Sequence, residues 1–183
     1  MIRAAFVALL LIALPLSASD LPTAGRNYFT DIELTNQNGE KVRLYSDLIA
    51  GKTVVINSFF STCVGICPIM AATFTRIQNK LGDRLGRDVI LISITVDPET
   101  DTPARLRDYA KSMSAKPGWY FVTGKRENVE AALAKLGLRA ASKEEHTSVM
   151  IIGNEPLGVW KKAFGLASSD DIVKMVEDAA AGK

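Results

Sequence analysis

The stretch TVVINSFFSTCVGICPIMAATFTRIQNKLGDRLGRDVILISITV, residues 53–96, decides the fold. Its first part, residues 53–60, is a β-branched and aromatic run, and its last part, residues 88–96, is almost wholly apolar, so each predicts a buried strand. Between them, apolar residues recur at helical spacing, at Met70, Phe74, Ile77 and Leu81. A strand, a helix and a second strand in this order predict a βαβ crossover that joins two parallel strands.

Further elements extend this unit in both directions along the chain. Before the unit, the sequence predicts a β-hairpin over 29–44 and a short helical segment over 45–50. After it, the sequence predicts a helix that opens at Thr102 and Pro103, a strand over 119–123, a helix over 129–136 and a second hairpin over 147–164. A last helix is predicted over 172–179, after the capping candidates Ser168 and Ser169. This order suits an α/β fold, a three-layer sandwich with a central mixed sheet and an added N-terminal β-hairpin.

The composition is that of one ordinary globular domain. The chain has 183 residues and a formal net charge of +2, with 48% hydrophobic and 23% charged residues. Such a chain has enough apolar surface to offset the conformational entropy lost on folding. It has no block of lysine and arginine, and nucleic-acid binding requires a concentrated positive face, so no nucleic-acid partner is expected.

The N-terminus resembles an export signal. Arg3 precedes an uninterrupted apolar run over residues 4–14, and small residues follow Pro15. A membrane-spanning helix needs about 20 apolar residues, more than this segment provides. We therefore expect residues 1–19 to be a signal peptide, or else a short N-terminal anchor. Residues 20–183 would then form the folded domain, exported to the periplasm or an equivalent oxidising compartment and, with an anchor, attached to the inner membrane.

The two cysteines of the chain, Cys63 and Cys67, directly follow the first predicted crossover strand. Ligand sites in such sheets lie beyond the carboxyl ends of the strands, where the next helix begins. The helix N-terminus stabilises anions, so at least one thiol is expected to ionise below its ordinary pKa of about 8.5, which would make both reactive at neutral pH. Packing alone does not require two thiols at this edge.

The spacing of the cysteines leaves both redox and metal chemistry open. Helical residues four apart place their Cβ atoms about 5 to 6 Å apart, whereas a disulfide needs about 3.5 to 4.5 Å. Two thiolates on one metal ion tolerate the wider spacing, so metal binding requires less distortion.

The single histidine, His146, precedes a predicted apolar strand of the same sheet. In thioredoxin-like sheets the start of that late strand lies beside the cysteine helix. A histidine in a loop is more often a solvated spectator, but here it would complete a set of two thiolates and one imidazole. This set suits Cu(I) and is compatible with zinc in an open site, and neutral imidazole also tolerates Cu(II).

Several motifs together resemble the Sco/SenC family, whose members are thioredoxin-fold copper proteins that help to assemble the copper A centre of cytochrome c oxidase. The resemblance covers about residues 29–181 in the family's order. Its motifs are TCVGICP at 62–68, VDPETDTP at 96–103, Trp119 ahead of VTG at 122–124, and His146 followed by Thr147.

The resemblance implies that Cys63, Cys67 and His146 are copper ligands, for Cu(I) or Cu(II), and that Asp97 lies near the site. It also implies a partner, the copper A subunit of cytochrome c oxidase or another periplasmic copper protein. Read from residue type alone, Asp97, Glu99 and Asp101 are turn and capping residues of a proline-rich segment rather than ligands of a hard metal.

The leading hypothesis is a metallochaperone rather than an enzyme: an assembly factor that delivers copper to the copper A site or prepares the thiols of that site. The alternative is a thiol–disulfide oxidoreductase or redox sensor in which Cys63 and Cys67 are the redox-active thiols. A peroxiredoxin-like peroxidase is disfavoured, because no proline precedes Cys63 within ten positions and Thr62 is adjacent to it.

Overall fold

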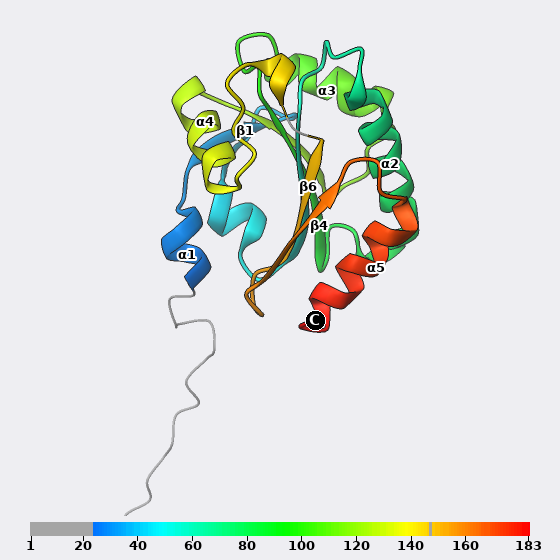
Figure 1. The fold of residues 1–183 in the computed structure, drawn as a ribbon. Coiled ribbons are helices and arrows are strands. Elements are labelled where there is room, and N and C mark those ends of the chain that lie inside the picture. The colour runs from blue at the N-terminus through cyan, green and yellow to red at the C-terminus, as the bar shows by residue number, and fades with distance from the viewer. Residues whose placement is uncertain (1–23, 147) are drawn as a thin grey trace, which may run out of the picture.

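A seven-stranded mixed sheet forms the centre of the molecule in the computed structural model, which describes residues 24–146 and 148–183 (Figure 1). The strand order across the sheet is β2-β1-β5-β4-β3-β6-β7. The strands are β1 (Glu33–Asn36), β2 (Lys41–Arg43), β3 (Thr53–Phe59), β4 (Val89–Thr95), β5 (Trp119–Thr123), β6 (Val149–Asn154) and β7 (Val159–Phe164).

The predicted βαβ crossover is confirmed. Strands β3 and β4 pair in parallel from Thr53↔Val89 to Phe59↔Thr95, and helix α2 (Ile66–Leu81) connects them. All seven residues of each strand are buried, as the apolar runs predict for strands covered on both faces. The outer pairs, β1 with β5 and β6 with β3, are antiparallel, which makes the sheet mixed.

Two layers of helices cover the sheet, one on each face (Figure 1). One face packs against α2, α3 (Pro103–Ser112) and α5 (Ser169–Ala180). The other packs against α1 (Ala24–Phe29), α4 (Arg126–Lys135) and a π-helical turn, η2 (Leu44–Ile49). Together with the β1–β2 hairpin, these layers give the expected thioredoxin-like three-layer sandwich.

The prediction that the first hairpin starts at Phe29 was wrong. Phe29 ends helix α1, and the first strand begins at Glu33. Phe29 is buried, and its ring centroid lies 4.7 Å from that of Trp160 on the distant strand β7. Tertiary packing therefore overrides the local alternation that favours a strand.

Some sequence predictions concern residues outside the described part of the chain, namely the segment 1–19 and Thr147. Within the described residues, no helix has both the length and the apolar character needed to cross a membrane.

Candidate metal centre

The two cysteines lie where strand β3 ends and helix α2 begins. Cys67 is the second residue of the helix, and Gly65 is its N-cap. Cys63 precedes the helix in a turn in which its backbone N–H donates to the Phe60 carbonyl at 3.2 Å. Both thiols are free. Cys67 is only 2% exposed whereas Cys63 is half-buried, so solvent and partners reach Cys63 more easily.

His146 lies beside the two cysteines although it is 79 positions after Cys67 in the sequence. It follows the short 3-10 helix η4 (Lys143–Glu145), just before β6. Its Nε2 lies 3.2 Å from Cys67 Sγ, and its Nδ1 lies 2.7 Å from the Lys143 carbonyl oxygen. Because a carbonyl only accepts, this contact assigns the proton to Nδ1 in the neutral imidazole and leaves the Nε2 lone pair facing the thiols. Such a hydrogen bond typically orients a metal-binding histidine.

The three side chains converge into one group of donors. Cys63 Sγ, Cys67 Sγ and a ring nitrogen of His146 all lie within 4.8 Å of one another, the one such group found in the described part of the chain. Thiolate and imidazole ligands sit about 2.0 to 2.3 Å from a metal ion, so two ligands of one ion are at most about 4.6 Å apart. Small side-chain rotations would therefore bring all three donors onto a single ion. Two sulfurs and one nitrogen form a soft set that fits copper or zinc.

The expectation that both thiols are reactive at neutral pH was wrong for Cys67. Burial, and next a hydrogen bond with Cys63, raise the pKa of the Cys67 thiol to about 12. Its side chain packs in the apolar core on the α2 side of the sheet, where the thiolate loses its hydration. The helix N-terminus does not offset this loss, so in the absence of metal Cys67 remains protonated at neutral pH.

Asp97 lies beside the histidine loop rather than among the donors. Burial opposes its ionisation, but hydrogen bonds from Lys143 and Thr100 outweigh that effect and lower the pKa of the Asp97 carboxyl. Lys143 Nζ donates to Asp97 Oδ2 at 2.9 Å, and the carbonyl of the same lysine holds His146. Asp97 is thus connected to the imidazole through one intervening residue.

Sequence reasoning missed the role of Asp101, which it assigned to a turn. The carboxylate is fully buried and accepts hydrogen bonds from the Ser61 backbone N–H at 3.1 Å and from Thr95 Oγ1 at 2.5 Å. It also accepts from the Ser61 hydroxyl. Asp101 therefore ties the end of β4 to the segment that leads into Cys63. The only signal in the sequence was a second aspartate within the VDPETDTP motif.

Comparison with known proteins places this arrangement in a family. The family model described as SCO1/SenC matches residues 22–176, most of the chain. The chain belongs to the SCO1/SenC family. A relative from Bacillus subtilis, the SCO1 protein homolog, is 30% identical over 155 residues, which cover 79% of each chain. A SCO2-like protein from Rickettsia prowazekii is 34% identical over 137 residues, which cover 68% of this chain and 62% of that protein.

Solved structures of the family share the fold. The structure of BsSco, described as a member of the Sco family of cytochrome c oxidase assembly proteins with a disulfide switch, has a TM-score of 0.68 and 31% identity, covering 82% of this chain and 92% of that one. Arabidopsis thaliana ScoI with copper bound has a TM-score of 0.67 and 22% identity, covering 82% and 96%. These likenesses agree with the thioredoxin-like fold expected from the sequence.

Proposed function

We propose that this chain is a copper-binding assembly factor for cytochrome c oxidase, and that Cys63, Cys67 and His146 hold the copper as cargo. The observation that carries the proposal is the convergence of these three donors within 4.8 Å. Two relatives support it by their descriptions: BsSco as an assembly protein of cytochrome c oxidase, and Arabidopsis ScoI as a copper-bound protein.

The donor set suits copper in both oxidation states. Two thiolates favour Cu(I), and a neutral imidazole nitrogen is a good ligand for Cu(II) as well. The tautomer set by the Lys143 carbonyl presents the unprotonated Nε2 to the ion. A structural zinc site would need a fourth ligand, and the chain has no further cysteine or histidine.

The exposure of the site suits transfer to a second protein. Cys67 is buried while Cys63 is half-buried, and Val64, between them in sequence, is 97% exposed. A partner thiol therefore approaches Cys63 first and exchanges for it on the ion, without a change in the oxidation state of copper. Each thiol that binds the ion as a thiolate gives up a proton, and each thiolate released takes one back.

The partner in this proposal is the copper A subunit of cytochrome c oxidase or another periplasmic copper protein. The proposed location is the periplasm or its exported equivalent, with residues 1–19 serving as a signal peptide or short anchor. The proposed location rests on two features of the sequence. One is the apolar run over residues 4–14, and the other is the pair of cysteines, which can form a disulfide in an oxidising compartment.

Titration of the reduced protein with Cu(I) and with Cu(II) tests the proposal. We expect one equivalent of either ion in the wild type. Cys63→Ser and Cys67→Ser should weaken Cu(I) binding most, and His146→Ala should weaken Cu(II) binding most. Met113→Leu, which removes a sulfur outside the donor group, serves as the matched control and should change neither. If all three ligand variants retained the wild-type stoichiometry and affinity, the assignment would be rejected.

A second candidate function is thiol–disulfide exchange, favoured by two free thiols four positions apart at a helix N-terminus. Here the two thiols would form one disulfide and pass two electrons and two protons to a disulfide of the partner, which becomes two thiols. Under this alternative His146→Ala retains exchange with a partner disulfide, whereas either cysteine substitution abolishes it. Copper binding that depends on His146 separates the two functions.

A further inference from the structure

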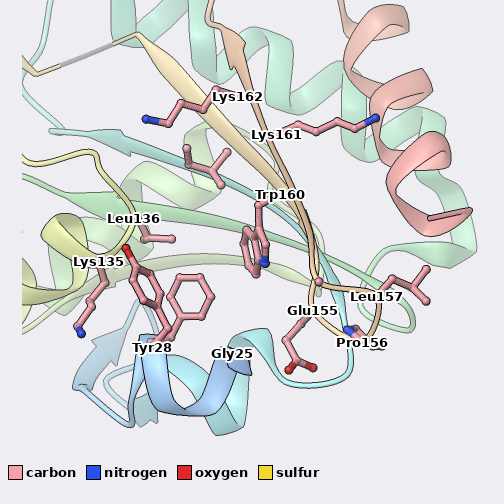
Figure 2. Close-up of a pocket in the computed structure, with 13 residues that line it drawn as sticks. Gly25, Tyr28, Lys135, Leu136, Glu155, Pro156, Leu157, Trp160, Lys161 and Lys162 are labelled. Carbon is pink, nitrogen blue, oxygen red and sulfur yellow. The ribbon is translucent and has the colours of Figure 1, made fainter. Parts of the chain in front are cut away.

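A large cavity lies away from the metal centre, on the sheet face that α1 and α4 cover (Figure 2). Its volume is about 790 Å³, within the range of about 300 to 1,000 Å³ typical of small-molecule sites. None of the three metal-site donors lines it. The apolar part of its wall comes from three separate regions of the chain and consists of Tyr28, Phe29, Leu136, Ile151, Pro156, Leu157 and Trp160.

The hollow depends on two glycines that allow close packing. A side chain at Gly153 would collide with the indole ring of Trp160, so the glycine lets this ring lie against strand β6. A Cβ at Gly25 would lie 2.9 Å from Glu155 Oε1, so the glycine lets α1 approach the β6–β7 turn. Phe29 packs on Trp160 from the α1 side, with ring centroids 4.7 Å apart. The aromatic wall is thus held in place by the fold.

Two exposed apolar side chains mark the edge of this cavity. Tyr28 and Leu157 are each 54% exposed, although both are large and hydrophobic. Water contact of this kind costs free energy that an apolar ligand would recover. In Figure 2 these side chains lie at opposite ends of the hollow, with Trp160 between them.

The charges along the cavity are positive at one side. Lys135 and Lys162 point to the side of the hollow next to Leu136 (Figure 2), and neither forms an ion pair with an acid in residues 24–146 or 148–183. Lys135 Nζ lies 5.1 Å from the centroid of the Tyr28 ring. The one carboxylate of the wall, Glu155, lies at the other end and accepts hydrogen bonds from the Tyr45 hydroxyl at 2.9 Å and the Gly51 N–H at 3.0 Å.

From these features we infer that the cavity binds a single-chain amphipathic anion, with an acyl chain along Trp160 and a carboxylate on the side of the hollow that carries Lys135 and Lys162. The apolar wall excludes a fully polar ligand, because its polar groups would lose hydration without gaining partners. The two lysines favour an anionic head over a neutral or cationic one. This site is independent of the proposed copper chemistry, because it shares no lining residue with the metal centre.

Bromine-quenched fluorescence of the full-length protein tests the inference. The probe is 11-bromoundecanoate below its micelle concentration, and the neutral comparison is 11-bromoundecan-1-ol. We expect saturable quenching at one equivalent of the acid. The quenched component should be lost in Trp160→Phe, because the second tryptophan, Trp119, is 2% exposed in the core and out of the probe's reach.

Lysine variants test the charge of the head group. At least one of Lys135→Gln and Lys162→Gln should weaken binding of the acid about threefold to fivefold, the size of an exposed ion pair, and both should leave binding of the alcohol unchanged. Lys161→Gln is the matched control, since Lys161 borders the cavity on the same strand but Figure 2 shows its side chain directed to the other side. The far-ultraviolet circular dichroism spectrum and the urea midpoint should stay at the wild-type values in every variant, which confirms that each is folded.

Several results would overturn the inference. Non-saturating quenching, or equal quenching in Trp160→Phe, would mean adsorption outside the cavity. Equal binding of acid and alcohol, insensitive to both lysines, would exclude the anionic class. If sedimentation showed a dimer that forms without the probe and prevents quenching, the cavity would be occupied by a second copy of this chain instead of by the anion. Leu136→Trp, which fills part of the hollow, should reduce binding, and full binding in a folded Leu136→Trp variant would also contradict the assignment.

Discussion

Replacing Asp101 by alanine should reduce both stability and metal binding. The carboxylate is fully buried and holds the Ser61 N–H at 3.1 Å and the Thr95 hydroxyl at 2.5 Å. Alanine removes the acceptor of these two donors and of the Ser61 hydroxyl, and each such loss costs about 1 to 3 kcal/mol, less for half-buried Ser61 than for fully buried Thr95. We therefore expect a loss of about 3 to 5 kcal/mol in the free energy of unfolding, a large share of the 5 to 15 kcal/mol of a typical domain.

The same substitution acts on the metal centre through the chain. Ser61 is two residues before Cys63, so releasing its backbone lets the Cys63 sulfur move away from Cys67 and His146. Copper affinity should fall even under conditions in which the variant is fully folded. Asp101→Asn, whose amide oxygen still accepts a hydrogen bond, should lose about half as much stability as the alanine variant.

Urea denaturation followed by circular dichroism measures the first effect, and competition with a Cu(I) chelator measures the second. Asp83→Ala removes an exposed acid and should change stability by less than about 0.5 kcal/mol. If Asp101→Ala matched Asp83→Ala in midpoint and slope, the tethering argument would be refuted. If only the copper affinity changed, the carboxylate would position the site without supporting the fold.

Two further predictions concern stability. Burial raises the pKa of the Cys67 thiol to about 12 in the fold, so the unfolded chain loses this proton first, and stability falls as pH rises from the ordinary thiol pKa towards 12. In Cys67→Ala the free energy of unfolding, measured by urea titration, should fall less steeply with pH, by up to about 1.4 kcal/mol per pH unit. If the wild type and the variant lost stability with pH at the same rate, the burial argument would be contradicted. Gly118 has φ +98°, and a side chain there would collide with the Gly86 backbone, so Gly118→Ala should cost at least about 2 kcal/mol. Gly39→Ala, with φ +84° but open space around it, should cost only about 1 kcal/mol by the same assay, and equal losses would show that the collision adds nothing.

The sequence predicts the central strands well because their signal is local and strong. Residues 53–60 and 88–96 are long apolar runs, and a run of this kind is buried in almost any sheet that contains it. Thr102 and Pro103 likewise predict the start of a helix, because an N-cap side chain bonds to a backbone N–H only a few residues away. In the structure Thr102 Oγ1 accepts from the Arg105 N–H at 3.3 Å. Sequence patterns therefore predict the features that neighbouring residues determine.

Features fixed by distant residues were not predictable in the same way. The Cys67 thiol was expected to ionise readily because only its helix N-terminus is visible in the sequence. Its actual environment includes Phe59 and Phe121 from two different strands, and their packing removes water from the sulfur. The cavity shows the same limit, because Tyr28, Leu136 and Trp160 meet only through the tertiary fold.

Strand β6 explains how one small domain can hold the candidate metal site and a separate cavity. Side chains alternate along a strand, so Met150 and Ile152 pack into the core on the α2 side of the sheet while Ile151 lines the cavity on the other face. His146 lies just before this strand, and its imidazole is positioned by the η4 carbonyl of Lys143 rather than by the cavity wall. Substitutions that fill the hollow beside Leu136 therefore need not move the imidazole. A change in the pairing register between β6 and β3, by contrast, would disturb both sites at once.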